Sequence, residues 1–383
     1  MQLGKIQIST IVTAVFILAA CGQAAPAGPA GPSAGSSNPP SVATASGWND
    51  VAAAAKKEGK VTIFGPQGTD ISDAYTQGFE KKYPGIQVDF SGMAGPQVSP
   101  KLLGALTAGQ HPADIVIAGS TTVLLSLRPA NALQPLQPFL IGPDIEPAKW
   151  TGGKLDFADN DGQYDLAYAA RVQIPFIYST KTVKQSDFKS WKDLLDPKWK
   201  DKILMQDPRI AGAGLDIVSF LYAHEGLGPD YLKALFAQNI LIQNDARQMI
   251  DLVASGERPI GIGPNGTIAW DMKNQGVPIE LFPGEALQEG SFITASNSNL
   301  AIIRDLEHPN ATKLYLDYLL SAEGQAAASK ATGLASLRLD VPRSDIPDAV
   351  VPKPGVKYLE NYKEPYQKQG AEILSFIKTV VPG

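Results

Sequence analysis

The run Lys60-Val-Thr-Ile-Phe-Gly-Pro-Gln-Gly-Thr-Asp70 is the most informative stretch for the fold of this chain. Its first five residues are typical of a buried strand, and glycines then interrupt the pattern. Ile71, Tyr75 and Phe79 follow at helical spacing, so they lie on one face of a helix. The run therefore predicts a strand, a loop at the carboxyl end of that strand, and a helix.

The same alternation of strand and helix continues on both sides of this run. Residues 48–59 read as a helix, Ile86 to Phe90 alternate as in a half-buried strand, and Leu102 to Leu106 mark another helix. Asp114-Ile-Val-Ile-Ala118 then reads as a buried strand, and Ser120 begins the next helix. A βαβαβα order of this kind predicts a parallel sheet covered by helices.

A second α/β unit follows a change of pattern. Asp159-Asn-Asp-Gly162 predicts a hairpin turn between antiparallel runs at 155–158 and 164–170. Further strands are expected at 172–178, 203–205, 240–242, 259–263, 278–282 and 300–303, and helices at 212–223, 245–255, 267–274, 311–320, 322–330 and 365–379. The expected domains are 47–165 for the first part of lobe 1, 166–288 for lobe 2, and 289–383 for a return to lobe 1 with C-terminal helices.

The N-terminal segment predicts export and lipid attachment. Lys5 precedes the short apolar run 6–20, which ends in Leu18-Ala-Ala-Cys21 and is typical of a signal peptide at 1–20. Leu18-Ala-Ala-Cys21 resembles a bacterial lipobox, in which the cysteine is acylated, palmitate being the expected chain. Cys21 is the only cysteine, so no disulfide forms within the chain. Residues 21–46, rich in Ala, Gly, Pro and Ser, then form a flexible tether.

Composition and charge narrow the function classes. The chain is 44% hydrophobic and 19% charged, which is typical of a globular protein. Its net charge of −5 and the absence of a basic run give no sign of nucleic-acid binding. No apolar run after the tether is long enough for a transmembrane helix.

Two loops at the predicted carboxyl ends of strands offer polar side chains beside helix N-termini. Gln67 and Thr69 follow the first strand, and Ser120 and Thr121 follow the third. Free N–H groups and the positive end of the helix dipole make such loops suitable for ligands. The alternative is that Thr69 or Asp70 only caps its helix, and the sequence leaves both roles open.

Two arginines are candidate anion ligands. Arg209 lies in Asp207-Pro-Arg-Ile-Ala-Gly-Ala-Gly214, where Gly212 and Gly214 at a helix start suit close approach of an anion to the backbone. Arg171 enters an otherwise apolar strand and therefore needs a partner, either a carboxylate such as Asp207 or a ligand. A surface arginine on a capped helix remains the alternative for Arg209.

Gly261-Ile-Gly-Pro-Asn-Gly266 matches the dinucleotide fingerprint G-x-G-x-x-G, with Glu280 about twenty residues later. The fingerprint normally occupies the first βα turn of its domain, whereas this one falls deep in the second unit. We therefore interpret it as a turn at the edge of a cleft, with Asn265 and Thr267 as polar contacts. We expect no cofactor.

Trp191-Lys-Asp-Leu-Leu-Asp-Pro-Lys-Trp-Lys-Asp-Lys-Ile203 resembles a stretch of the extracellular solute-binding proteins of ABC importers, in the group that includes the ferric-iron-binding proteins. Ala113-Asp-Ile-Val116 and Ser321-Ala-Glu-Gly-Gln325 match the same group. The resemblance implies a two-lobed α/β fold of the type II periplasmic-binding-protein class, with mixed sheets flanked by helices, a hinge and an inter-lobe cleft. It also implies capture of a solute for a membrane permease, without chemistry on the solute.

The resemblance does not name the solute. Ferric-binding relatives carry adjacent tyrosines where this chain has Gly266 and Thr267. The histidines His111, His224 and His308 are scattered, and we interpret them as solvated surface residues, so no metal site is expected. A small organic or phosphorylated anion is the preferred solute; a ferric chelate, a cation such as thiamine or a polyamine, and a sugar stay open.

Functions of other classes have less support in the sequence. No Walker P-loop, H-E-x-x-H, G-x-S-x-G or Cys-His pair occurs, so the chain is not expected to be an enzyme. An exported hydrolase with paired carboxylates remains an alternative, since such pairs leave no local motif, and so does an adhesive surface protein. The expected partners are the solute, ABC permease subunits and the membrane through Cys21, with the protein itself a monomer at the outer face of the cytoplasmic membrane.

Overall fold

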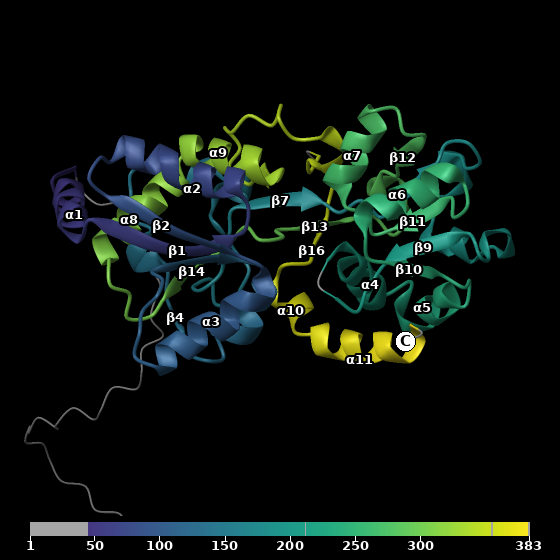
Figure 1. The fold of residues 1–383 in the computed structure, drawn as a ribbon, viewed down its shortest axis with the longest axis horizontal. Helices are drawn as coiled ribbons and strands as arrows, with labels where there is room; N and C mark the ends of the chain where they lie inside the picture. The colour runs from purple at the N-terminus through teal and green to yellow at the C-terminus, as the bar shows by residue number, and fades with distance from the viewer. Residues whose placement is uncertain (1–44, 211, 354, 382–383) are drawn as a thin grey trace, which may run out of the picture. The chain divides into compact units, whose positions relative to one another are not determined.

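The computed structural model describes residues 45–210, 212–353 and 355–381. Figure 1 shows these residues as mixed α/β structure, in which three sheets are covered by helices. The predicted signal peptide, Cys21 and almost all of the tether lie outside the described residues. Among those described, no helix has both the length and the apolar character needed to cross a membrane.

The first sheet has the strand order β2-β1-β3-β14-β6-β5, and β4 pairs with β14. Its strands are β1 (Lys60–Pro66), β2 (Gln87–Met93), β3 (Ile115–Ala118), β4 (Leu133–Gln134), β5 (Asp156–Phe157), β6 (Leu166–Ala167) and β14 (Asn299–Ile303). The predicted parallel pairing of β1 with β2 and β3 is confirmed. β14 lies antiparallel to β3, so the chain does return to this sheet late in the sequence.

Helices cover the first sheet on both faces. They are α1 (Ala45–Glu58), α2 (Thr69–Lys82), α3 (Gly95–Thr107), the π-helix η1 (Thr121–Leu127), α8 (Pro309–Leu319) and α9 (Ala322–Thr332). α1 and α8 pack together although 250 residues of sequence separate them, because Glu58 accepts hydrogen bonds from the backbone N–H groups of Asn310 and Ala311 at the start of α8.

The second sheet has the order β10-β9-β11-β8-β12. Its strands are β8 (Phe176–Ser179), β9 (Ile203–Gln206), β10 (Leu241–Gln243), β11 (Ile260–Ile262) and β12 (Ile279–Leu281). Its helices are α4 (Ala213–Ala223), α5 (Gly228–Phe236), α6 (Ala246–Ser255) and α7 (Gly266–Asn274). β9, β10 and β11 run parallel to one another, whereas β8 is antiparallel to both of its neighbours.

A third, smaller sheet connects the two larger ones. Its order is β15-β7-β13-β16, made of β15 (Ala335–Ser336), β7 (Ala169–Val172), β13 (Phe292–Thr294) and β16 (Leu359–Glu360). β7 carries the chain from the first sheet toward the second, and β13 brings it back antiparallel to β7. We call these four strands the hinge sheet, because every chain crossing between the two larger sheets runs along it or beside it.

The apolar cores follow the same division. One core cluster holds Val61, Phe79 and Leu300, which belong to the first sheet and its helices. A second core holds Phe176, Trp191 and Phe282 from the second sheet. The C-terminal helix α11 (Gly370–Val380) adds Ile373 and Ile377 to this second core. The domain boundaries expected from the sequence remain a proposal.

The structure corrects two expected elements. The single strand expected at 172–178 is two strands in different sheets, β7 and β8, because Pro175 has no N–H to donate to a continuous ladder. The single helix expected at 365–379 is α10 (Glu364–Gln367) followed by α11. Gly370 lies at this break, where glycine disfavours a continuous helix.

Asp114, the residue before β3, joins three segments. Its carboxylate is buried and accepts hydrogen bonds from the backbone N–H groups of Thr62 (2.7 Å), Glu307 (3.1 Å) and His308 (3.1 Å). The Nδ1 atom of His308 lies 2.9 Å from the same carboxylate. The interpretation of His308 as a solvated surface histidine was therefore wrong, because this pairing compensates its burial.

We expect Asp114→Ala to lower the free energy of unfolding by about 2–5 kcal/mol, because three backbone donors lose a charged acceptor. Urea unfolding followed by tryptophan fluorescence would measure the change. Asp251→Ala, at an exposed position of α6, is the matched control and should stay within about 0.5 kcal/mol of the parent. Equal midpoints for Asp114→Ala and the parent would contradict this role.

Candidate functional site

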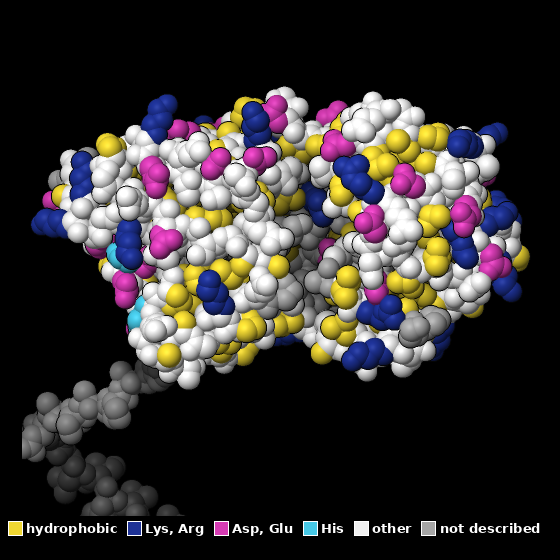
Figure 2. Space-filling model, in the orientation of Figure 1, with side chains coloured by type: hydrophobic (Ala, Val, Ile, Leu, Met, Phe, Trp, Pro, Cys, Tyr) yellow, Lys and Arg dark blue, Asp and Glu magenta, His cyan; other side chains and the backbone are white. Residues whose placement is uncertain are grey.

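The candidate site lies where loops leave the carboxyl ends of parallel strands in both large sheets. β1 and β3 end at Pro66 and Ala118, and β9 and β11 end at Gln206 and Ile262. Figure 2 shows a hollow in the middle of the molecule, between its two halves, with a small patch of basic surface inside it. Ligands of open α/β sheets bind at strand ends of this kind.

Gln67 lies exposed in the loop between β1 and α2, and Thr69 is the exposed first residue of α2. The N-cap of α2 is Gly68, whose φ of 138° suits glycine, and no side chain caps this helix. The alternative role of Thr69 or Asp70 as the capping residue is therefore wrong. The two polar side chains of Gln67 and Thr69 are available to a ligand.

Ser120 and Thr121 follow β3 and have different surroundings. The Ser120 hydroxyl is buried beside the carboxyl of Asp165 and has no hydrogen-bond partner among the described residues. Thr121 donates through its Oγ1 atom to the Oε1 atom of Gln367, at 2.6 Å. A ligand that uses Thr121 must therefore share or displace the contact with Gln367.

Arg209 lies exposed in the loop after β9 and folds back onto Asp207. Its backbone N–H and Nε each donate to Oδ1 of Asp207 at 2.9 Å, and Nη2 donates to Oδ2 at 2.9 Å. This fork holds the pKa of the Asp207 carboxyl below its usual range. Because an internal carboxylate already occupies the guanidinium edge, an anion at Arg209 must compete with Asp207.

Gly212 and Gly214 begin α4 and pack against the end of β9. The N–H of Gly214 donates to Oε1 of Gln206 at 2.9 Å. A Cβ at Gly214 would lie 2.1 Å from the Gln206 carbonyl oxygen, and one at Gly212 would lie 3.2 Å from Oε1 of Gln206. These glycines therefore permit the close approach of α4 to β9 and have a packing reason independent of any ligand.

The G-x-G-x-x-G run has the same kind of explanation. A Cβ at Gly261 would lie 2.9 Å from Val253. Gly263 has a φ of 68°, and a Cβ there would lie 3.0 Å from the backbone nitrogen of Gly214. Asn265 caps α7, since its Oδ1 accepts from the N–H of Ile268 at 3.1 Å. The glycines of this run therefore have packing reasons of their own. Asn265 caps α7, and the predicted ligand contact would be a second role for it.

Arg171 occupies the third position of β7, in the hinge sheet, opposite Thr294 of β13. Its side chain is partly buried, and within the described part of the chain no acceptor forms a hydrogen bond or ion pair with it. Burial lowers the pKa of Arg171, and the attraction of Asp216 in α4 opposes that effect. A guanidinium in such a place has five donors for an incoming anion.

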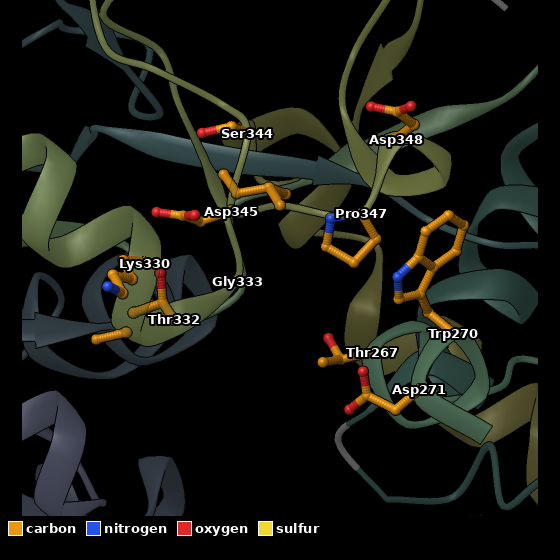
Figure 3. A pocket seen from close by; sticks show the side chains of 12 residues that line it. Thr267, Trp270, Asp271, Lys330, Thr332, Gly333, Ser344, Asp345, Pro347 and Asp348 are labelled. Atoms are coloured by element: carbon orange, nitrogen blue, oxygen red, sulfur yellow. The ribbon is translucent and has the colours of Figure 1, made fainter. Parts of the chain in front are cut away.

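A cavity of about 440 Å³ opens beside α7 and the end of α9. Figure 3 shows Thr267 and Trp270 on one side of it and Thr332 and Gly333 on the other, with Pro347 between Gly333 and Trp270. Asp271, Asp345 and Asp348 add carboxylates to its rim, and Lys330 adds one cation. None of the ligand-binding residues predicted from the sequence lines this cavity, apart from Thr267, which the sequence analysis gave as a polar contact.

Among the described residues, no three His, Cys, Asp or Glu side chains lie close enough together to bind a metal ion. Gly266, at one of the positions where ferric-binding relatives carry tyrosine, is buried against Ile174 and Val350. A Cβ there would lie 3.3 Å from Ile174, so this position is filled by apolar packing.

We expect Gly214→Ala to lower the free energy of unfolding by about 1–3 kcal/mol, since the added methyl would overlap the Gln206 carbonyl. Guanidinium unfolding would measure it. Gly104→Ala in α3 is the matched control: nothing lies within 4 Å of its Cβ position, so it should be neutral or stabilising by up to about 1 kcal/mol. A Gly214→Ala protein as stable as the parent would contradict the packing argument.

Asp165 generates a pH prediction. Burial raises the pKa of its carboxyl to about 7, while a hydrogen bond from Asn299 (2.8 Å) opposes this. The folded pKa lies above the unfolded value, so the carboxyl contributes most stability below about pH 4 and loses it as the pH rises through 7. Asp165→Asn removes this loss, so its stability relative to the parent should increase by about 1–4 kcal/mol between pH 4 and pH 8.

Urea unfolding of both proteins at several pH values would measure the difference. A difference in stability that stays constant from pH 4 to pH 8 would contradict the raised pKa.

Comparison with known proteins places this geometry in a family. Residues 74–354 match the family model described as bacterial extracellular solute-binding protein. A putative 2-aminoethylphosphonate-binding periplasmic protein of Salmonella typhimurium is 28% identical over 176 residues, which is 45% of this chain and 51% of that protein. An uncharacterized Haemophilus influenzae protein is 29% identical over 147 residues, 37% of this chain and 40% of that protein. The chain thus spans about half the length of these curated relatives or less.

Solved structures show the same fold at low identity. A Trichodesmium protein in complex with iron and citrate superposes with a TM-score of 0.65 and 19% identity, covering 84% of this chain and 99% of that one. Iron-bound HitA from Pseudomonas aeruginosa superposes with a TM-score of 0.62 and is 21% identical, covering 84% of this chain and 99% of that one. AfuA from Actinobacillus pleuropneumoniae, with fructose-6-phosphate bound, superposes with a TM-score of 0.60 and is 19% identical. The match covers 84% of this chain and 98% of that one. The expected two-lobed fold is confirmed, and the chain belongs to the bacterial extracellular solute-binding protein family.

Proposed function

We propose that this protein is the substrate-binding component of an ABC importer, which captures a small organic or phosphorylated anion between its lobes and delivers it to the permease. The lobes close on the solute by motion at the hinge sheet, as hinged binding proteins do. The protein performs no chemistry on the solute.

The observation that carries the preference for an anion is the position of Arg171. It lies on a strand that connects the two large sheets, it is partly buried, and the described residues supply no hydrogen-bond acceptor for its guanidinium. A desolvated cation without a partner is unfavourable, and an anionic ligand removes that cost. A carboxylate or phosphonate can engage two of its N–H groups at once.

The ligands named for related proteins support a small organic or phosphorylated anion as the solute. The Salmonella relative is named for an aminophosphonate, and the AfuA structure holds a sugar phosphate. The Trichodesmium structure holds iron together with citrate. A ferric chelate is therefore the second candidate, since a citrate-like carboxylate would use Arg171 in the same way.

The remaining residues of the proposed site lie at the carboxyl ends of strands or at the starts of the helices that follow them. Gln67, Thr69, Ser120 and Thr121 come from the first lobe, and Arg209, Gly212, Gly214 and Asn265 come from the second. In this proposal Arg171 binds the anionic group, and the loops supply weaker polar contacts that set specificity. Cys21 carries the lipid, the tether holds the monomeric body near the membrane, and the permease receives the solute there.

We expect Arg171→Ala to weaken binding of the anionic solute at least tenfold, because truncation leaves the ligand charge desolvated without its partner. Isothermal titration calorimetry would measure this, with 2-aminoethylphosphonate and inorganic phosphate as the probes. Arg171→Lys should lie between the parent and Arg171→Ala, since it keeps the charge but loses the planar fork.

Arg247→Ala is the matched control, because Arg247 is exposed on α6, far along the chain from the hinge sheet. It should bind like the parent, as solvated charges contribute little. If Arg171→Ala bound every anionic probe as tightly as Arg247→Ala does, the anion proposal would be wrong and a neutral or cationic solute would replace it.

A further inference from the structure

Asp216 introduces a negative charge next to the candidate anion site. It lies in the first turn of α4, an otherwise apolar helix that packs on the hinge sheet through Phe220, whose ring stacks on Phe292 of β13 at 5.0 Å. Asp216 is itself partly buried. An acidic side chain at this position is not needed to cap the helix, because the N-cap is Gly212.

The surroundings of Asp216 disfavour the ionised form of its carboxyl. Burial raises the pKa of its carboxyl to about 6, against the opposing effects of Arg171 and the side chain of Asn361. Among the described residues, Asp216 forms no ion pair. A carboxylate whose ionised form the fold disfavours is typical of a functional site.

Two more acceptors near Arg171 lack hydrogen-bond partners. Asn361 follows β16 and is 8% exposed; its N–H is fixed by the carbonyl of Ile293 (3.1 Å), and its Oδ1 atom accepts no hydrogen bond from the described residues. Gln173, 2% exposed, also has an Oε1 atom without a donor. Gln173 is the first residue after β7, two positions beyond Arg171.

We propose that Asp216 and Asn361 bind the ammonium group of a small zwitterionic solute whose anionic group binds Arg171. This inference rests on the proposed function and narrows its substrate class. Buried polar groups without partners are rare and are expected to be satisfied by a ligand or by water. Asp216 and Asn361 offer acceptors, whereas Arg171 offers only donors, so the floor of the site complements a molecule that carries both charges.

The arrangement also limits the charge of the solute. Arg171 and Asp216 each shift the pKa of the other, so the proposal requires a solute whose anionic and ammonium groups belong to one small molecule. A dianion without an ammonium group would face the Asp216 carboxylate, and a simple cation would face Arg171. Each of these would bind less favourably than the zwitterion.

The test compares matched pairs of probes that differ only in the ammonium group. One pair is 2-aminoethylphosphonate and ethylphosphonate, and the other is β-alanine and propionate. Calorimetric titration of the parent body should show at least a tenfold preference for the zwitterion of one pair. Asp216→Asn should reduce that preference to less than about threefold, while the thermal midpoint of the empty variant stays equal to or above that of the parent.

Asp251→Asn, at an exposed position of α6, is the charge-matched control and should keep the full preference. Equal affinity of the parent for both members of a pair, or a full preference in Asp216→Asn, would overturn the zwitterion assignment. The same holds if no member of either pair binds. In each of these cases the proposed function still stands if inorganic phosphate or another simple anion binds the parent and Arg171→Ala weakens it.

Discussion

The placement of one guanidinium on the strand that connects two sheets is the constraint on which the proposed site depends. Arg171 lies in β7, and β13 beside it returns the chain to the first sheet, so the residue lies on the strands about which the proposed closure of the lobes takes place. The Arg171 guanidinium is desolvated by burial and has no hydrogen-bond acceptor among the described residues, which is unfavourable for a charged group. In the proposed function, binding of an anion removes this cost of desolvation.

The rest of the site is built on packing that has reasons of its own. Gly214 and Gly263 let α4 and β11 approach each other, and Asn265 caps α7. Arg209 is held by Asp207 in a fork of three hydrogen bonds. These contacts hold Arg209, Gly214 and Asn265 in place independently of any solute.

Much of the fold could be predicted from the sequence, and the site only in part. The period of the apolar residues predicted β1, α2 and β3 because each buries one regular face. β7 and β8 were merged because an apolar run does not show which sheet each half joins, although Pro175 marked the break. Asp216 could have been noticed as one carboxylate in an apolar helix, whereas Asn361 has no local signal, since its partners come from α4 and β13. His308 pairs with Asp114, 194 residues earlier, so no local pattern could indicate its burial. Thr69 does not cap α2 because the backbone places Gly68 at the N-cap, which the sequence alone does not show.

A crystal structure of the body with its solute bound tests the central claim most directly. The account predicts that a carboxylate, phosphonate or phosphate group of the solute lies within hydrogen-bond distance of two guanidinium nitrogens of Arg171, with the loops after β1 and β9 closed around it. The account would be contradicted if the bound solute made no polar contact with Arg171 and the two large sheets kept the separation that they have without solute.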